Sequence, residues 1–198
     1  QAVFGQIAFD ITDKVEVSLG GRYFEPEVSV QGFFGFGIGF TEEGWSGTGE
    51  DQCNVIGVGQ ADRKDAPCHN VNKIISESDS VYRANVTWKP TDATMLYATW
   101  SEGYRPGGVN RNPFAGDYER DILTNYEIGW KSGWADGRLR TQFDVFYNDY
   151  ENFQVIVGYP QIPVFGFELN NPNPTTIYGF EAQLEAVFGA FSIDAGLG

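Results

Sequence analysis

The sequence is short of basic residues and has no long hydrophobic run. Its 13 Lys and Arg residues stand against 27 Asp and Glu residues, which gives a formal net charge of -14 at pH 7. Because such a chain repels phosphate groups, we expect no nucleic-acid partner. The longest apolar stretch, Gly32–Phe40, is too short and too rich in glycine to cross a bilayer as a helix, which needs about 20 apolar residues.

Motifs for catalysis and for metal binding are also missing from the sequence. The single histidine, His69, follows Cys68 directly and has no second ligand at the spacing of a metal site. No P-loop, His-Glu-x-x-His or Gly-x-Ser-x-Gly motif occurs. We therefore predict a protein that is not an enzyme, that binds no metal and that needs no cofactor.

Alternation of apolar and polar residues is what the sequence does contain. Between Leu139 and Asn148 every second residue is apolar or a threonine, and only Phe146 lies on the wrong face. About eight segments show this period of two, which predicts an all-β, antiparallel fold. They are Val3–Ile11, Val15–Tyr23, Tyr82–Trp88, Met95–Glu102, Tyr126–Lys131, Leu139–Asn148, Phe180–Ala186 and Phe191–Leu197.

The connections between these segments alternate strictly between short and long. Consecutive hairpins then place every short turn at one end of the sheet and every long loop at the other. Outer-membrane barrels have this asymmetry, so we predict a segment of an up-and-down transmembrane β-barrel whose long loops are extracellular. The short turns lie at residues 12–14, 90–93, 135–137 and 188–190, and the long loops are Glu25–Asp79, Arg105–Ile122 and Ile156–Pro174.

Aromatic residues near the ends of the predicted strands agree with a membrane environment. Trp88, Trp130 and Trp134 lie beside the tight turns, whereas Tyr23 and Tyr104 lie toward the long loops. Amphipathic rings are favoured at both membrane interfaces. A soluble sheet would alternate in the same way, but its loops would seldom be as long as the first one here.

Short motifs in several of these strands occur in a recognisable order. They are Ile11–Val15, Leu19–Tyr23, Leu96–Asn110, Asn125–Ser132, Phe143–Tyr150 and Ile177–Glu185. Together they resemble the barrel of TonB-dependent outer-membrane receptors and cover most of the chain outside the long loops. The sequence starts and stops inside alternating segments, so we interpret residues 1–198 as part of such a barrel.

The resemblance implies a barrel of about 22 strands in the outer membrane of a Gram-negative bacterium, with a plug domain inside. It implies uptake of a scarce nutrient, most often a ferric siderophore, with energy supplied through TonB. The partners are then outer-membrane lipid, the protein's own plug domain, TonB and a small-molecule ligand. Two alternatives stay open: a passive porin or small complete barrel, and a soluble β-sheet module that binds carbohydrate.

The same interpretation assigns the two faces of the strands. Tyr126, Ile128 and Trp130 are expected to face lipid, and Glu127 and Lys131 the lumen, because a lipid-facing charge at the midplane costs about 2–4 kcal/mol. Charged residues on the lumen face either pair with each other or with the plug, or simply face water. These residues are Arg22, Arg83, Glu127, Arg140, Glu181 and Glu185.

The first long loop holds both cysteines of the chain. Outside the cytosol, Cys53 and Cys68 are expected to form a disulfide. Closing a loop of about 15 residues would restrict the unfolded chain by about 3 kcal/mol. Metal binding by the two thiols and His69 is the weaker alternative, because three donors are few for a metal site.

Two further features of this loop have open interpretations. Its ten acidic residues against three basic ones suit either a mouth that attracts cationic ligands or a solvated loop. Gly32–Phe40 suits a lid, an apolar ligand site or an extended ribbon, because exposed phenylalanines are unfavourable in water.

Ligand contacts are expected where rings and hydrogen-bond donors lie beside the long loops. This expectation comes from position alone, and packing of the rim explains the same residues nearly as well. The candidates are Tyr104, Arg105, Asn110, Arg111, Tyr150, Asn152 and Gln154.

Overall fold

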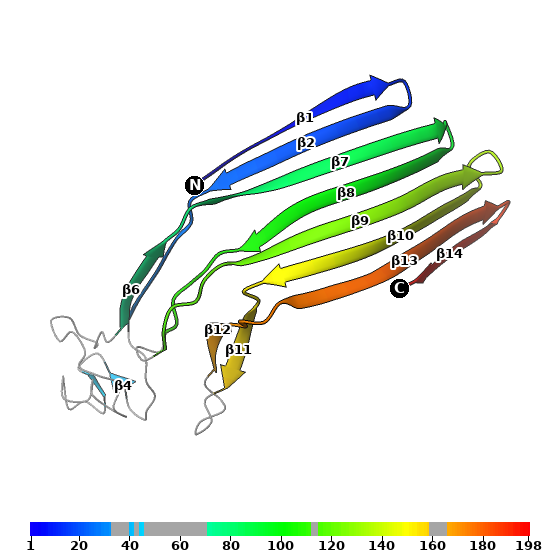
Figure 1. The fold of residues 1–198 in the computed structure, drawn as a ribbon. Coiled ribbons are helices and arrows are strands. Elements are labelled where there is room, and N and C mark those ends of the chain that lie inside the picture. Colours follow the sequence, from blue (N-terminus) through cyan, green and yellow to red (C-terminus); the bar gives the residue numbers. More distant parts are fainter. Residues whose placement is uncertain (33–39, 42–43, 46–70, 112–114, 159–165) are drawn as a thin grey trace.

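The computed structural model describes residues 1–32, 40–41, 44–45, 71–111, 115–158 and 166–198 (Figure 1). Within these ranges the chain forms one sheet of eight strands and three sheets of two strands. Among the described residues, no helix is long and apolar enough to span a membrane.

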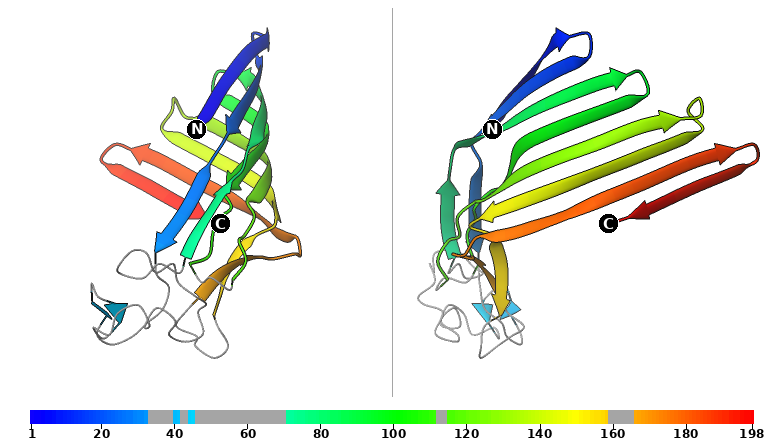
Figure 2. Two further views of the ribbon diagram at one scale, coloured as in Figure 1. Left: turned by 90° about the vertical axis from the view of Figure 1, so that its left-hand side faces the viewer. Right: turned by 45° about the vertical axis from the view of Figure 1, so that its right-hand side comes forward.

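The main sheet is an antiparallel meander: its eight strands lie side by side in the order in which they occur in the sequence. The order is β1-β2-β7-β8-β9-β10-β13-β14, and β1 and β14 form the edges of a single curved wall (Figures 1 and 2). This confirms the prediction of an all-β, antiparallel fold with about eight strands in the wall. The strands are β1 (Ala2–Thr12), β2 (Val15–Phe24), β7 (Asp79–Thr91), β8 (Thr94–Arg105), β9 (Asp121–Trp134), β10 (Leu139–Glu151), β13 (Thr175–Phe188) and β14 (Phe191–Leu197).

Tight turns join the strands at one end of the wall, and the long connections leave from the other (Figure 1). The turn after β9 places Ala135, Asp136 and Gly137 at φ values of 53°, 55° and 81°. Gly189, in the turn after β13, has a φ of 61°. This left-handed backbone reverses the chain within a few residues, and it favours glycine and aspartate.

The long connections contain short strands of their own, so they are more regular than the alternation pattern suggested. β3 (Glu27–Gly32) pairs with β6 (Val71–Ser76), β11 (Gln154–Gly158) pairs with β12 (Gly166–Asn170), and β4 (Phe40–Thr41) pairs with β5 (Gly44–Trp45). The chain leaves the wall after Glu151, earlier than a loop beginning at Ile156 would require. The β-branched run Val155–Val157 forms the β11 strand instead.

One face of the wall is apolar and stays exposed. Residues at the same level pair across neighbouring strands, as Ile128 does with Ala98 and Val145. Val3 and Phe191 on this face are 74% and 77% exposed. The only buried hydrophobic residues among those described are Phe24, Val109 and Ala186, so the chain provides no core of its own for this face.

The opposite face is mostly polar, and Phe146 is one of the apolar residues on it, with Phe4, Ile177 and Val187. The register places Phe146 beside Gly179, where a Cβ would come within 2.9 Å of the ring. The ring therefore occupies the space that the glycine leaves free. Phe146 therefore lies on the polar face because it pairs with Gly179 of β13. The alternation within Leu139–Asn148 holds no information about this partner on another strand.

Candidate functional site

Side chains on the polar face hydrogen-bond to one another near the middle of β8 and β9. The Tyr97 hydroxyl donates to Glu127 Oε1 at 2.6 Å, and Asn85 Nδ2 donates to Thr99 Oγ1 at 2.8 Å. The Lys131 ammonium lies 5.6 Å from the centre of the Tyr97 ring. Gly129 lies directly beneath that ring, and a Cβ there would overlap it.

The charged residues expected on this face pair only in part. Arg140 Nη1 lies 4.0 Å from Glu185 Oε2, with both side chains more than half exposed, so the pair contributes little stability. The Arg22 guanidinium lies 5.8 Å from the centre of the Tyr104 ring. Arg83 and Glu181 make no ion pair with any residue that the structure describes.

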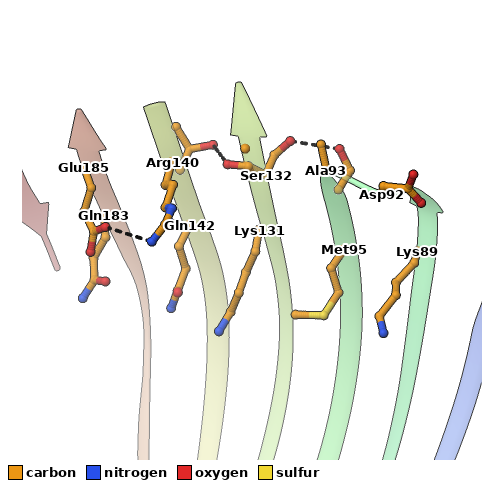
Figure 3. Close-up of a pocket in the computed structure, with 13 residues that line it drawn as sticks. Lys89, Asp92, Ala93, Met95, Lys131, Ser132, Arg140, Gln142, Gln183 and Glu185 are labelled. Atoms are coloured by element: carbon orange, nitrogen blue, oxygen red, sulfur yellow. Dashed lines mark hydrogen bonds and ion pairs between the residues drawn. The ribbon is translucent and has the colours of Figure 1, made fainter. Parts of the chain in front are cut away.

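A cavity of about 500 Å³ opens at the short-turn end of the wall (Figure 3). Lys89, Met95 and Lys131 lie next to one another along it, and Arg140 turns toward Glu185. The cavity lies at the opposite end of the strands from the predicted ligand contacts, so it does not bring those residues together.

The long-loop end of the wall, which we call the rim, gathers most of the predicted ligand residues. Tyr104 stacks on the buried ring of Phe24, with centroids 3.5 Å apart and an interplanar angle of 3°. Tyr150 meets Phe153 edge to face at 5.1 Å. Apolar ring contacts thus hold both tyrosines in place.

Arg105 and Gln154 meet at one buried carboxylate. Asp121 is only 2% exposed. It accepts hydrogen bonds from Arg105 Nε at 2.8 Å, from Arg105 Nη2, and from the backbone amide of Gln154 at 3.3 Å. Gln154 Nε2 also donates to the carbonyls of Pro106 and Glu119, at 2.9 and 3.0 Å. Sequence reasoning missed Asp121, because nothing in its local pattern distinguishes it from a loop acid.

Asn110 forms a second buried contact, this time with β12. Its Nδ2 donates to the carbonyls of Gly116 and Glu168, at 2.7 and 2.8 Å, and its Oδ1 accepts from the Glu168 amide at 2.8 Å. Asn110 is 6% exposed. Its side chain amide therefore joins the β8–β9 connection to the β11–β12 hairpin.

Tyr118 closes the β8–β9 connection on itself. Gly108 and Tyr118 exchange backbone hydrogen bonds at 2.9 and 3.0 Å, and a Cβ at Gly108 would overlap the Tyr118 hydroxyl. Burial, followed by a hydrogen bond to Glu168, raises the pKa of Tyr118 to about 12. The neutral phenol is therefore the stable form here.

Arg111 and Asn152, the remaining candidates, are exposed. Asn152 has a φ of 55° at the bend between β10 and β11, and its carbonyl accepts from Asn170 Nδ2 at 2.7 Å. Arg111 has no hydrogen bond or ion pair with the described part of the chain. The structure thus brings Arg105, Asn110 and Gln154 into internal contacts and leaves Arg111 open to solvent.

Several features predicted for the first long connection lie outside the described residues. These are Cys53, Cys68, His69 and nearly all of Gly32–Phe40. Two of its four described acids form ion pairs: Arg120 Nη1 lies 3.7 Å from Glu77, and Arg120 Nη2 lies 2.5 Å from Asp79. Within the described ranges, no group of His, Cys, Asp and Glu residues is arranged to hold a metal ion.

Comparison with solved structures shows which fold this wall belongs to. The ferric yersiniabactin uptake receptor FyuA from Yersinia pestis matches with a TM-score of 0.66 and 16% identity, over 99% of this chain and 26% of that one. The ferric-catecholate import receptor Fiu from E. coli K12 gives 0.65 and 16%, over 98% and 26%. The haemophore receptor HasR of Serratia marcescens gives 0.62 and 18%, over 98% and 32%.

This chain therefore spans about a quarter to a third of the length of these receptors. A family model described as "TonB dependent receptor-like, beta-barrel" matches residues 1–198, the whole chain. The meander, the short turns at one end and the long connections at the other agree with that match. The chain belongs to the TonB-dependent receptor β-barrel family.

Proposed function

We propose that this chain forms part of the barrel wall of an outer-membrane receptor, in a Gram-negative bacterium, that takes up a ligand with energy from TonB. The observation that carries the proposal is the two-faced sheet, with one apolar face left exposed and one polar face. Lipid satisfies the first face and an aqueous or plug-filled lumen the second. A soluble carbohydrate-binding module would need to bury the apolar face.

A ferric siderophore is the proposed ligand. Two of the similar receptors named above are an uptake receptor for ferric yersiniabactin and an import receptor for ferric catecholates. The third is a haemophore receptor in complex with its haemophore and haem, so haem is the alternative ligand to be tested beside the siderophore. The proposed contacts at the rim are Tyr104, Arg105, Asn110, Arg111, Tyr150, Asn152 and Gln154.

Among these candidates, Arg111 is the best placed to meet a ligand directly. It is exposed, and its guanidinium is not paired within the described residues. A guanidinium suits the carboxylate or catecholate oxygens of an anionic iron chelate. On the polar face, Glu127 and Glu181 are the proposed contacts of a plug domain, because both carboxylates point to the lumen and neither has an ion-pair partner among the described residues.

The test is uptake by the full-length receptor in a Gram-negative host that lacks its own siderophore and haem receptors. We expect growth under iron limitation on a ferric siderophore, and loss of that growth in a host without TonB. If the cells grow on haem and do not grow on a ferric siderophore, haem is the ligand and the siderophore proposal is wrong. Solute entry that does not depend on TonB would overturn the receptor proposal in favour of a passive pore.

Arg111→Ala separates ligand contact from general damage to the receptor. We expect it to raise the KM for uptake about tenfold, the effect of losing one charge-assisted hydrogen bond. Arg138→Ala, an exposed arginine at the short-turn end, is the matched control and should leave KM unchanged. Equal KM values for both variants would show that Arg111 does not contact the ligand.

A further inference from the structure

We propose that Asp121 is a positioning residue that holds the long connections of the rim together as one unit before any ligand arrives. The proposal rests on the proposed function only in taking the rim to be the ligand-binding end. Asp121 itself is 2% exposed, so it touches no ligand and acts through the residues that it holds.

The carboxylate of Asp121 joins two connections that are distant in the sequence. Arg105, at the end of β8, reaches it with its backbone amide at 3.2 Å as well as with its guanidinium. Gln154, at the start of β11, reaches it with its backbone amide at 3.3 Å. The guanidinium also lies 5.1 Å from the centre of the Phe153 ring, which fixes its plane.

Further hydrogen bonds attach the β11–β12 hairpin to the same connection. Asn170 Nδ2 donates to the Glu119 carbonyl at 2.8 Å, and Asn170 Oδ1 accepts from the Glu119 amide at 2.7 Å. In these contacts of Asn170, as in those of the Gln154 side chain and Asn110 described above, a side-chain amide pairs with backbone groups. Such pairs depend on direction and therefore hold one arrangement of the chain.

The first long connection is attached to the other side of residues 105–121. Glu77 Oε1 accepts from the Gly107 amide at 2.9 Å, and Arg120 lies between Glu77 and Asp79. Lys73 Nζ donates to the Ala115 carbonyl at 2.7 Å. The β8–β9 connection is thus the centre of the rim, with one long connection held on each side.

Losing the charge at Asp121 affects several donors at once. An asparagine would offer one uncharged oxygen where the Arg105 and Gln154 donors now share two carboxylate oxygens, and buried donors left unpaired are costly. Holding the rim in one arrangement also lowers the entropy cost of ligand binding, because the ligand need not order the connections itself. Asp121 should therefore affect ligand affinity without contacting the ligand.

The experiment uses the full-length receptor in detergent micelles, with Asp121→Asn as the variant that preserves shape. Hydrogen exchange of the backbone amides in 105–121, 154–158 and 166–170 is measured with mass spectrometry. We expect exchange in these segments to speed up by about tenfold or more, while the central parts of β8, β9 and β10 stay protected. Glu119→Gln, in the same connection but with an exposed side chain that has no hydrogen bond or ion pair within the described residues, is the control and should not change exchange.

Uptake kinetics of a ferric siderophore then test the effect on function. We expect Asp121→Asn to raise KM about tenfold with an unchanged maximal rate, since transport itself does not use the residue. If Asp121→Asn prevents assembly, Asn170→Ala replaces it, because Asn170 holds the same hairpin from a less buried position.

Unchanged exchange in β11 and β12 would overturn the proposal, and so would faster exchange with an unchanged KM. If the parent receptor takes up neither siderophore nor haem, the proposed function fails. The exchange measurement still decides whether Asp121 holds the rim together.

Discussion

At the scale of single residues, glycine lets bulky side chains lie flat on the polar face. Tyr97 lies over Gly129 and Phe146 over Gly179, each across a strand pair. Glycine in the interior of a strand weakens that strand. At these two positions the packing of the ring from the neighbouring strand offsets this loss.

Gly129→Ala is predicted to destabilise the barrel by about 1–3 kcal/mol, because the new Cβ overlaps the Tyr97 ring and displaces its hydroxyl from Glu127. Urea unfolding of the full-length receptor in micelles measures the change. Gly133→Ala is the control, since its Cβ would meet nothing closer than the Ala93 carbonyl at 3.9 Å. Equal unfolding midpoints for the two variants would contradict the prediction.

Tyr118 gives the rim a pH dependence at the alkaline end. The pKa of its phenol rises from the ordinary 10.0 to about 12, chiefly because of burial. A raised pKa means that the neutral form is stabilised in the folded rim. Its contribution is therefore complete below pH 10 and is lost as pH rises toward 12.

An ultraviolet titration of phenolate formation checks this sign. The difference between the parent receptor and Tyr118→Phe should show one tyrosine that ionises near pH 12. Tyr82→Phe, on the exposed outer face, serves as the comparison for the subtraction. A Tyr118 that ionises near pH 10 would show that its hydroxyl is neither buried nor bonded to Glu168.

At the scale of elements, alternate side chains of each wall strand point to the apolar face and to the polar face. Phe180 and Gln183 lie on opposite faces of β13, where they pair with Val145 and Gln142 of β10. A charge placed at position 180 would therefore lie on the apolar face, whereas the same charge at position 183 would lie on the polar face.

Phe180→Lys is expected to reduce assembly of the barrel, because an ammonium facing lipid near the midplane costs about 2–4 kcal/mol. Gln183→Lys on the polar face should assemble as the parent does. The fraction of heat-modifiable, folded receptor on a gel measures both variants. Equal assembly of the two would mean that the exposed apolar face does not meet lipid.

Between the wall strands and the rim, a single residue sets the direction of the chain. Asn152 has the left-handed backbone, with a φ of 55°, that turns β10 into β11. Asn152→Gly should retain stability, because glycine adopts this backbone freely, whereas Asn152→Val should cost about 1–2 kcal/mol of stability. The midpoints of urea unfolding and the KM for uptake are the readouts. If Asn152→Gly also loses affinity, the Asn152 side chain binds the ligand directly.

At the scale of the whole molecule, the wall has an apolar belt with tryptophans near its short-turn end. Trp88 and Trp134 are 49% and 46% exposed on the outer face, and Trp130 contacts Trp134 at 6.1 Å between ring centres. Such rings are favoured at a membrane interface. We therefore expect these tryptophans to determine how deep the receptor lies in a bilayer.

In reconstituted vesicles, lipids brominated near the headgroup should quench the tryptophan emission that Trp88→Phe and Trp134→Phe remove. Iodide in the aqueous phase should quench that same emission only weakly. The opposite order of quenching would place these rings in water and contradict the membrane orientation.

The sequence by itself determined the strands, their two faces and the alternation of short turns with long connections. A period of two is a local property, and it needs no knowledge of distant residues. For this reason Leu139–Asn148 and Val15–Tyr23 were found within a few residues of the β10 and β2 limits. The family motifs are local in the same sense, and they agreed with the match over the whole chain.

Only the tertiary structure decided what the polar residues of the rim do. The partners of Asp121 and Asn110 lie up to 33 and 58 positions away, and no spacing in the sequence relates them. Arg105, Asn110 and Gln154 looked like free donors beside a loop, yet the fold supplies their acceptors. Hydrogen-bond partners depend on direction and distance in space, which register and loop packing determine after the strands have formed.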